Sequence, residues 1–441
     1  MKIRGLLLAC VVLAGLLGVL YWSARSKKEK EESPAAASPD RPRLFAMRDA
    51  DIARIELQKK GGERIAFERN GAGEWKIVAP VQVDADQSAC SVVGSTLSLL
   101  SALRIVEEKA DDLTPYGLKE PAYTAALTQK DHPTRTLEIG DDTPTGNGMF
   151  ARVEGDPRIY SIPSYVKANI DKTVEDLRDK RMLTLSPAAI RKVELAGPKQ
   201  DLEFVRNGDQ WQMTRPHSYR IDSAQVDELV RSLLDSRMDF TGPDPAGYAA
   251  SFASEPAVAT AKLVTDSGAQ DLQLRGSKDL FLAKSSVVAG IFKVQNTLGT
   301  ALAKTADDFR NKRLFDFGSA EPDKLELHID GKPVFYTRSN GYWWSGDSTK
   351  MDVTSVQALV ESLRNLIATR LVDEGTIKPE IEVAVTSNDG KRVEKILLSK
   401  NAGRYVAKRD DGPTLYELDQ STYEAVEKKA AAVKPASPPA R

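Results

Sequence analysis

A chain of 441 residues is longer than one ordinary domain, and its length predicts two to four. Its net charge of −1 leaves no basic excess, so no nucleic-acid partner is expected. Two cysteines, Cys10 and Cys90, cannot form a disulfide framework, and three widely separated histidines argue weakly against a histidine-rich metal site. Neither a metal nor another cofactor is therefore predicted.

Residues 1–25 are predicted to form a membrane anchor. An uncharged run from Gly5 to Ala24 follows Lys2 and Arg4, and a helix of that length spans roughly 30 Å, the thickness of a bilayer's hydrocarbon core. A cleaved signal peptide remains an alternative, although the sequence around Tyr21 and Trp22 is a poor cleavage site. A lipoprotein signal ending at Cys10 is a third interpretation, but the apolar run continues well beyond it.

Two segments are predicted to be solvated and disordered. Residues 26–42 are charged and then rich in Pro, Ala and Ser, so they have no apolar set to bury, and residues 431–441 have the same texture. The first is interpreted as a tether and the second as a tail. Basic residues flank the apolar run on both sides, so the positive-inside rule does not decide its orientation. A very short segment ahead of a large body is typical of an exported body.

The body repeats itself three times. Blocks beginning at Arg43, Arg181 and Arg313 close on Ile55-Glu56-Leu57, Val193-Glu194-Leu195 and Leu325-Glu326-Leu327. Each is followed by an alternating run, a turn with Gly or Asn, and a tryptophan, which is a hairpin signal. These tryptophans are Trp75, Trp211 and the pair Trp343-Trp344.

Later landmarks recur in the same order. An aspartate predicted to cap a helix follows each tryptophan, at Asp84, Asp222 and Asp352. Strands come next, and then an apolar stripe at helical spacing, seen at Val166, Ile170, Val174 and Leu177 and again 132 residues later at Leu298, Leu302, Ala306 and Phe309. This stripe predicts a single closing helix in each unit, with cations at its carboxyl end.

The predicted fold is therefore α+β, with an N-terminal transmembrane helix and three tandem, mostly antiparallel repeats. The units are placed at residues 43–180, 181–312 and 313–430. Hairpin spacing does not fit a doubly wound nucleotide fold.

Residues with the chemistry of a site are few. The cations Arg178, Lys180 and Arg181 are candidates for binding an acidic partner, although a helix end that caps itself is the more ordinary interpretation. Trp343 and Trp344 are candidates for an exposed aromatic platform, whereas core anchoring is the simpler account for Trp75, Trp211 and one of the pair. Neighbouring residues on a strand point to opposite faces, so we expect one member of the pair in the core. No catalytic residues are assigned.

The chain resembles a bacterial family known as DUF4340, a domain of unknown function. The resemblance rests on RLFAMRDADIARIEL at residues 43–57, Glu74-Trp75 with Ala79-Pro80-Val81, YGLKEP at 116–121, the glycine- and aspartate-rich stretch 139–163, and DLRDKR at 176–181. It is strong in the first unit and weaker in the others. It implies a single-pass protein of the inner membrane, with its body facing the periplasm or exterior and with an accessory role beside gliding-type ABC transporters.

Three functions follow as hypotheses. The first is a non-enzymatic accessory or scaffold protein of the envelope, with other envelope or transporter proteins as partners. The second is a module that binds cell-wall or other polysaccharide through an exposed tryptophan. The third is a hydrolase, which would need acidic residues with raised pKa values in one cleft.

Overall fold

The computed structural model describes residues 41–45, 47–241, 245–329, 331–401 and 403–437. The chain divides into two compact units, one ending at Arg181 and the other beginning at Met182. The predicted anchor and residues 26–40 of the predicted tether lie outside the described residues. Within the described part of the chain, no helix combines the length and the apolar character needed to cross a membrane.

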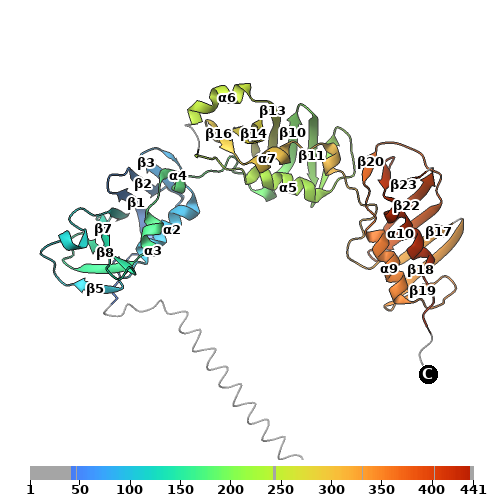
Figure 1. Cartoon of the computed structure of the whole chain (residues 1–441), viewed down its shortest axis with the longest axis horizontal. Helices are drawn as coiled ribbons and strands as arrows, with labels where there is room; N and C mark the ends of the chain where they lie inside the picture. The colour runs from blue at the N-terminus through green and yellow to red at the C-terminus, as the bar shows by residue number, and fades with distance from the viewer. Residues whose placement is uncertain (1–40, 46, 242–244, 330, 402, 438–441) are drawn as a thin grey trace, which may run out of the picture. The chain divides into compact units, whose positions relative to one another are not determined.

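The first unit is built on a nine-stranded sheet with the order β4-β3-β2-β1-β6-β7-β8-β9-β5 (Figure 1). Its strands are β1 (Ile52–Lys59), β2 (Arg64–Arg69), β3 (Trp75–Ala79), β4 (Val83–Asp84), β5 (Arg104–Glu107), β6 (Tyr123–Gln129), β7 (Arg135–Asp142), β8 (Gly148–Val153) and β9 (Ile159–Pro163). Its helices are α2 (Gln87–Ser98), α3 (Tyr165–Ile170) and α4 (Val174–Leu177), with single 3-10 turns at Asp49–Asp51 and Thr114–Tyr116.

The second unit contains two further sheets. One has the order β12-β11-β10-β13-β14-β15-β16 and the other β19-β18-β17-β21-β22-β23-β24-β20. The strands of the former are β10 (Ile190–Gly197), β11 (Gln200–Asn207), β12 (Gln210–Arg215), β13 (Ala257–Thr265), β14 (Gly268–Ser277), β15 (Leu280–Ser285) and β16 (Ile291–Val294). Those of the latter are β17 (Lys324–Ile329), β18 (Lys332–Ser339), β19 (Tyr342–Ser345), β20 (Arg370–Val372), β21 (Ile381–Ser387), β22 (Arg392–Asn401), β23 (Arg404–Arg409) and β24 (Leu415–Leu418).

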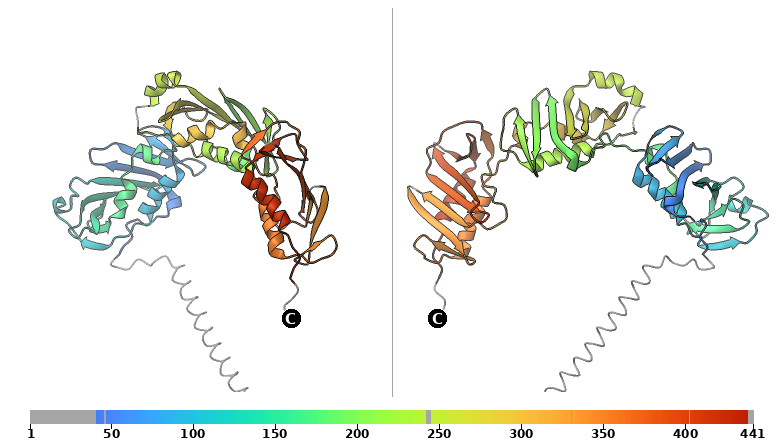
Figure 2. Two further views of the ribbon diagram at one scale, coloured as in Figure 1. Left: turned by 45° about the vertical axis from the view of Figure 1, so that its right-hand side comes forward. Right: turned by 180° about the vertical axis from the view of Figure 1, so that it is seen from behind.

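Apart from α6, which packs on the 3-10 turn that precedes it, the helices lie along one face of each of these sheets (Figure 2). The first set is α5 (Ser223–Leu234), α6 (Ala249–Ser254), α7 (Asn296–Leu302) and α8 (Ala306–Phe309), and the second is α9 (Val353–Arg364) and α10 (Gln420–Ala431). Helices α9 and α10 contact each other on the face of the third sheet that they cover. Every named strand pairing in the described residues is antiparallel, which confirms the predicted pairing. The protein is β-rich, with few helices.

The three sheets share one topology. Leu57, Leu195 and Leu327 lie on β1, β10 and β17, and each of these strands pairs with the next strand in sequence on one side. On the other side each pairs with the first long strand after the unit's first helix, where the three leucines face Ala125, Ala261 and Val383. The sequence blocks that match therefore occupy equivalent strands.

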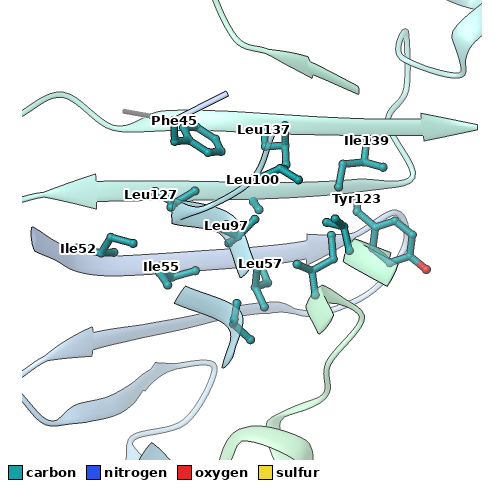
Figure 3. Packing of buried hydrophobic residues seen from close by; sticks show 14 of the residues in the cluster. Phe45, Ile52, Ile55, Leu57, Leu97, Leu100, Tyr123, Leu127, Leu137 and Ile139 are labelled. Carbon is teal, nitrogen blue, oxygen red and sulfur yellow. The ribbon is translucent and has the colours of Figure 1, made fainter. Parts of the chain in front are cut away.

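Each sheet has its own apolar core beneath its helices. In the first, Ile55, Leu57, Leu97 and Leu127 come together from β1, α2 and β6 (Figure 3). The buried residues of the second core come from Met182–Phe309 and those of the third from Leu314–Val426. Trp75, Trp211 and Trp343 are 1%, 3% and 2% exposed, which confirms the prediction that they are core anchors.

The predicted single closing helix is wrong in the first two units. The apolar stripe is buried as expected except at Ala306, which is half-buried, but α3 ends at Ile170 and α4 begins at Val174. Thr173 and Asp176 form a capping box at this new start, and Thr305 and Asp308 form the same box before α8. A capping box satisfies the free N–H groups of a helix start, so it favours two short helices over one continuous helix.

Asp84 does not cap the first helix. It lies on β4, where its carboxylate accepts a hydrogen bond of 2.6 Å from Lys76. The cap is Asp86, whose Oδ1 accepts from the backbone N–H groups of Ser88 and Ala89. Asp222 and Asp352 cap α5 and α9 as predicted.

A backbone latch closes each repeat. The chain that follows the last helix pairs with the residues just before the first helix, through the bridges Ala85↔Arg178, Ile221↔Arg310 and Met351↔Pro435. The third latch involves residues that the sequence analysis assigns to a disordered tail. Asp352 donates its N–H to Lys434 at 2.9 Å, and Ala436 donates to Lys350 at 2.9 Å. Residues 434–436 are therefore part of the third repeat, because backbone pairing needs no apolar side chain.

Candidate functional site

A polar cleft of about 1350 Å³ lies within the second unit, between the segment leading into α5 and the loops of the third sheet. Its walls carry Arg220, Arg392, Arg409, Asp316, Asp373 and Asp411. A concave surface with converging charged groups is the usual place to look for a site.

Arg310 lies beside this cleft and is buried, with a side chain that is 4% exposed. Its Nη1 donates to Asp373 at 2.6 Å and to Asp307 at 3.2 Å, and its Nη2 donates to Thr414 at 3.2 Å. The guanidinium carbon lies 4.1 Å from the centre of the Tyr219 ring, the distance of a cation–π contact. A single arginine thus connects the end of α8 to two loops of the third sheet.

Tyr219 completes this connection. Its hydroxyl donates to Asp373 at 3.1 Å, so Asp373 accepts from both Tyr219 and Arg310. Burial raises the pKa of the Tyr219 hydroxyl, and its hydrogen bond to Asp373 raises it further. The phenol therefore stays protonated and acts as a donor at neutral pH.

Arg220 makes a second connection on the cleft wall. Its Nε donates to Asp316 Oδ2 at 3.2 Å, and its Nη1 donates to the carbonyl oxygen of Arg313 at 2.5 Å. Asn311 donates to the other oxygen of Asp316 at 3.2 Å. These contacts fix the short connector between α8 and the third sheet.

Arg409 and Glu394 form a buried ion pair behind Asp316. Arg409 Nη1 lies 3.1 Å from Glu394, and Arg409 Nη2 lies 2.7 Å from Asp411. Glu394 also accepts the backbone N–H of Asp316 at 3.0 Å. The hydrogen bond from Arg409 holds the pKa of Asp411 below its ordinary value.

These ion pairs suit a role in holding chain segments together rather than in acid–base chemistry. The four arginines, Arg220, Arg310, Arg392 and Arg409, are all engaged with carboxylates. Among the described residues, every carboxyl group with a clear shift has a lowered pKa, which is the opposite of what a general acid at neutral pH requires. Burial raises the pKa of the Cys90 thiol to about 12, so this thiol is a core group and a poor nucleophile. No cluster of potential metal ligands occurs within the residues that the structure describes.

The predicted cationic site belongs to the first unit. Helix α4 ends at Leu177, and Arg178 is its C-cap residue, so the first of these cations lies at a helix end as predicted. Its backbone is extended and bridges to Ala85, and Lys180 and Arg181 lie beyond the helix. Arg178 is half-buried, and burial lowers the pKa of its guanidinium. Arg181 is exposed and is paired with Asp179 at 2.5 Å, while Lys180 is half-buried.

The predicted aromatic site lies on β19, an edge strand of the third sheet. Trp343 points into the core, and Trp344 is half-buried on the opposite face, as predicted for neighbours on a strand. Tyr342 shares the face of Trp344 and is 45% exposed. Trp344 faces Thr337 on β18, so Phe335, two residues away, lies on this face as well.

Sequence reasoning missed the cleft. Its groups come from segments far apart in the chain, at residues 219, 316, 373 and 409, and spacing does not reveal such a juxtaposition. One signal was present, because Arg310 recurs in register with Arg178 at the end of an apolar stripe. An arginine that follows the last buried residue of the stripe in both units predicts a fixed contact where one repeat joins the next.

Comparison with known proteins yields one family. The family model described as Domain of unknown function (DUF4340) matches residues 75–249 and 275–381, which is more than half of the chain. No curated protein matches the sequence significantly.

Proposed function

Since the chain belongs to the DUF4340 family, we propose that it is a non-enzymatic accessory or scaffold protein of the bacterial cell envelope. In this proposal the N-terminal segment anchors it in the inner membrane and the body faces the periplasm or exterior. The partners are the membrane subunits of a gliding-type ABC transporter.

The observation that carries this proposal is the repeated two-faced sheet. One face of each sheet packs on helices, and the other bears ion pairs at equivalent positions. Glu56 accepts from Arg54 at 2.8 Å, Glu194 pairs with Lys192, and Glu326 lies 3.2 Å from Lys324. Three sheet faces whose charged groups are paired suit the docking of proteins better than the capture of one small molecule.

The cleft supports the same conclusion. Arg220 on its wall and Arg310 beside it link the second repeat to the connector and to a loop of the third sheet, so these charges maintain a defined surface. A scaffold needs such rigidity, because ordering a loose surface on binding costs affinity.

Site-specific photo-crosslinking tests the proposal. A photoreactive residue replaces Ala196, which is exposed on the open face of β10, and a matched one replaces Glu228, which is exposed on α5. In cells we expect adducts with transporter membrane subunits from position 196 and none from position 228. Purification of the full chain alone, with no adduct from either position, would reject the proposal.

A second function is favoured by one feature, the aromatic face of β18 and β19. Phe335, Tyr342 and Trp344 share it, and Lys324 and Lys350 lie 5.1 Å and 3.4 Å from the rings of Phe335 and Tyr342. Flat rings beside polar groups suit stacking on sugar rings, so this face is a candidate for binding polysaccharide. Sedimentation with isolated cell walls tests it. Retention by the wild type that is lost in Trp344→Ala but kept in Val393→Ala supports sugar binding, and equal sedimentation of both variants removes it.

A further inference from the structure

The first described residues of the chain join the first unit at a surface unlike the rest of it. Pro42 accepts a hydrogen bond of 3.0 Å from the N–H of Ala102, and Leu44 donates one of 3.0 Å to Leu100. Residues 42–44 therefore run antiparallel to residues 100–102. Five side chains flank this pairing, and we call them the entry patch: Arg41, Arg43, Leu99, Leu103 and Arg104.

The entry patch is both apolar and basic. Leu99 is 62% exposed and Leu103 is 36% exposed, and Val92, two helical turns before Leu99 on α2, is 48% exposed. The three arginines are also exposed. Within the part of the chain that is described, none of these arginines has an ion-pair partner, in contrast to the paired arginines of the cleft.

The other two repeats show that the fold does not require the exposed leucines of this patch, although Arg43 recurs as Arg181 and Arg313. The hydrogen bond from Leu44 to Leu100 recurs from Met182 to Ser236 and from Leu314 to Leu366, which fixes the alignment. The position of Leu99 is then occupied by Asp235 and Asn365, and that of Leu103 by Asp239 and Thr369. Among the described residues, the exposed leucines are thus confined to the first repeat.

Exposed leucines beside exposed arginines match the chemistry of an anionic lipid surface. The leucines gain by leaving water for the headgroup and acyl boundary, and the arginines are attracted to lipid phosphates and anionic headgroups. Position agrees with this occupant. Residues 26–40 separate the predicted span from the patch, and a fully extended chain of that length reaches about 50 Å at most.

We propose that the entry patch rests on the membrane and binds anionic phospholipid, so that the first repeat is held against the bilayer. The inference depends on the membrane anchor of the proposed function. It adds a second, reversible contact that fixes which surface of the first repeat faces the lipid.

The test uses the full chain in nanodiscs, with Cys10→Ser and one surface cysteine for a fluorescent label. Cys90 is fully buried and is not expected to react. The label is placed at Ser101, within the patch, or at Ile367, the equivalent position of the third repeat, which is 39% exposed. Lipids that carry a nitroxide on the headgroup quench labels that touch the surface.

We expect at least threefold stronger quenching at position 101 than at position 367 in discs containing phosphatidylglycerol, and a weaker difference in phosphatidylcholine alone. Leu99→Asp with Leu103→Asp, which installs the side chains of the second repeat, should abolish the difference. Arg41→Gln with Arg43→Gln and Arg104→Gln should abolish it by removing charge alone. These neutral changes are a second route if the first variant does not fold.

Equal quenching at both positions would overturn the proposal. A difference in quenching that these substitutions leave unchanged would also overturn it. A label at position 101 that is shielded without lipid would instead show that residues 1–40 or a second copy covers the patch. A chain that does not enter nanodiscs at all removes the anchor, and the patch proposal falls with it.

Discussion

Gln270 in the second sheet and Glu394 in the third occupy the same place, opposite Leu263 and Val385 on the neighbouring strand. Both anchor the block that begins each repeat. Gln270 accepts the N–H of Thr184 at 2.9 Å, and Glu394 accepts the N–H of Asp316 at 3.0 Å. Both groups accept a backbone hydrogen bond, but one is a neutral amide and the other is a buried carboxylate.

The residues beside them follow the same division. Ser285 donates to the carbonyl oxygen of Met182 at 2.5 Å, and Arg409 donates to the equivalent carbonyl of Leu314. The neutral pair, Gln270 and Ser285, makes hydrogen bonds to Thr184, Met182 and Val287, all within the second repeat. The charged pair, Glu394 and Arg409, also supports the cleft through Asp316 and Asp411. Backbone geometry is therefore what repeats, while the side chains adapt to what each repeat must contact.

The largest change in the free energy of unfolding should come from the buried tryptophan that the second and third repeats share. Trp211→Ala and Trp343→Ala each remove a buried indole, and each should lower the free energy of unfolding of its own sheet by about 3–5 kcal/mol. Hydrogen exchange measured by mass spectrometry, resolved to peptides of each sheet, separates the two effects. Costs that differ by much more than 1 kcal/mol would contradict the equivalence of the two cores.

The next largest change in stability should differ between the two repeats, because the equivalent anchoring groups are a carboxylate and an amide. Glu394→Ala leaves the buried guanidinium of Arg409 without one of its carboxylates and should cost about 3 kcal/mol. Gln270→Ala loses neutral hydrogen bonds at a half-buried position and should cost about 1 kcal/mol. Urea unfolding followed by the same exchange measurement provides both values. If the two variants are equally destabilised, the carboxylate has no role beyond that of the amide.

A smaller effect is expected for Trp344, whose ring is half-buried on the open face. Trp344→Ala should cost under about 1 kcal/mol, because little of the apolar surface that it loses is fully withdrawn from water. Trp343→Ala is the internal reference in the same exchange experiment. A loss at Trp344 as large as at Trp343 would place both rings in the core.

The smallest effect is one of pH. The hydrogen bond from Arg409 lowers the pKa of Asp411, so the stabilisation from this pair is complete above the ordinary carboxyl pKa of about 4 and is lost as the pH falls through the lowered value. Asp411→Asn should therefore reduce the acid sensitivity of the third sheet below pH 4 and leave the second unchanged. Exchange rates at pH 6 and pH 3 test this, and an unchanged acid response would show that Asp411 contributes nothing.

Much of the fold was predictable because apolar spacing and turn residues carry it. The matching blocks placed Leu57, Leu195 and Leu327 on equivalent strands, and neighbouring positions on β19 separated Trp343 from Trp344. Helix breaks were missed because Thr173 and Thr305 act through local hydrogen bonds that leave the apolar stripe intact. The cleft was missed because contacts such as Arg310 with Asp373 depend on how loops from two sheets meet.

The backbone latch has a consequence for biogenesis. Each repeat is completed by residues that lie after its last helix, and for the third repeat these are residues 434–436. A ribosome releases the chain from its amino end, so no repeat can finish folding until the connector beyond it has emerged. For the third repeat, shortening the chain before residue 434 would remove the segment that pairs with residues 350–352.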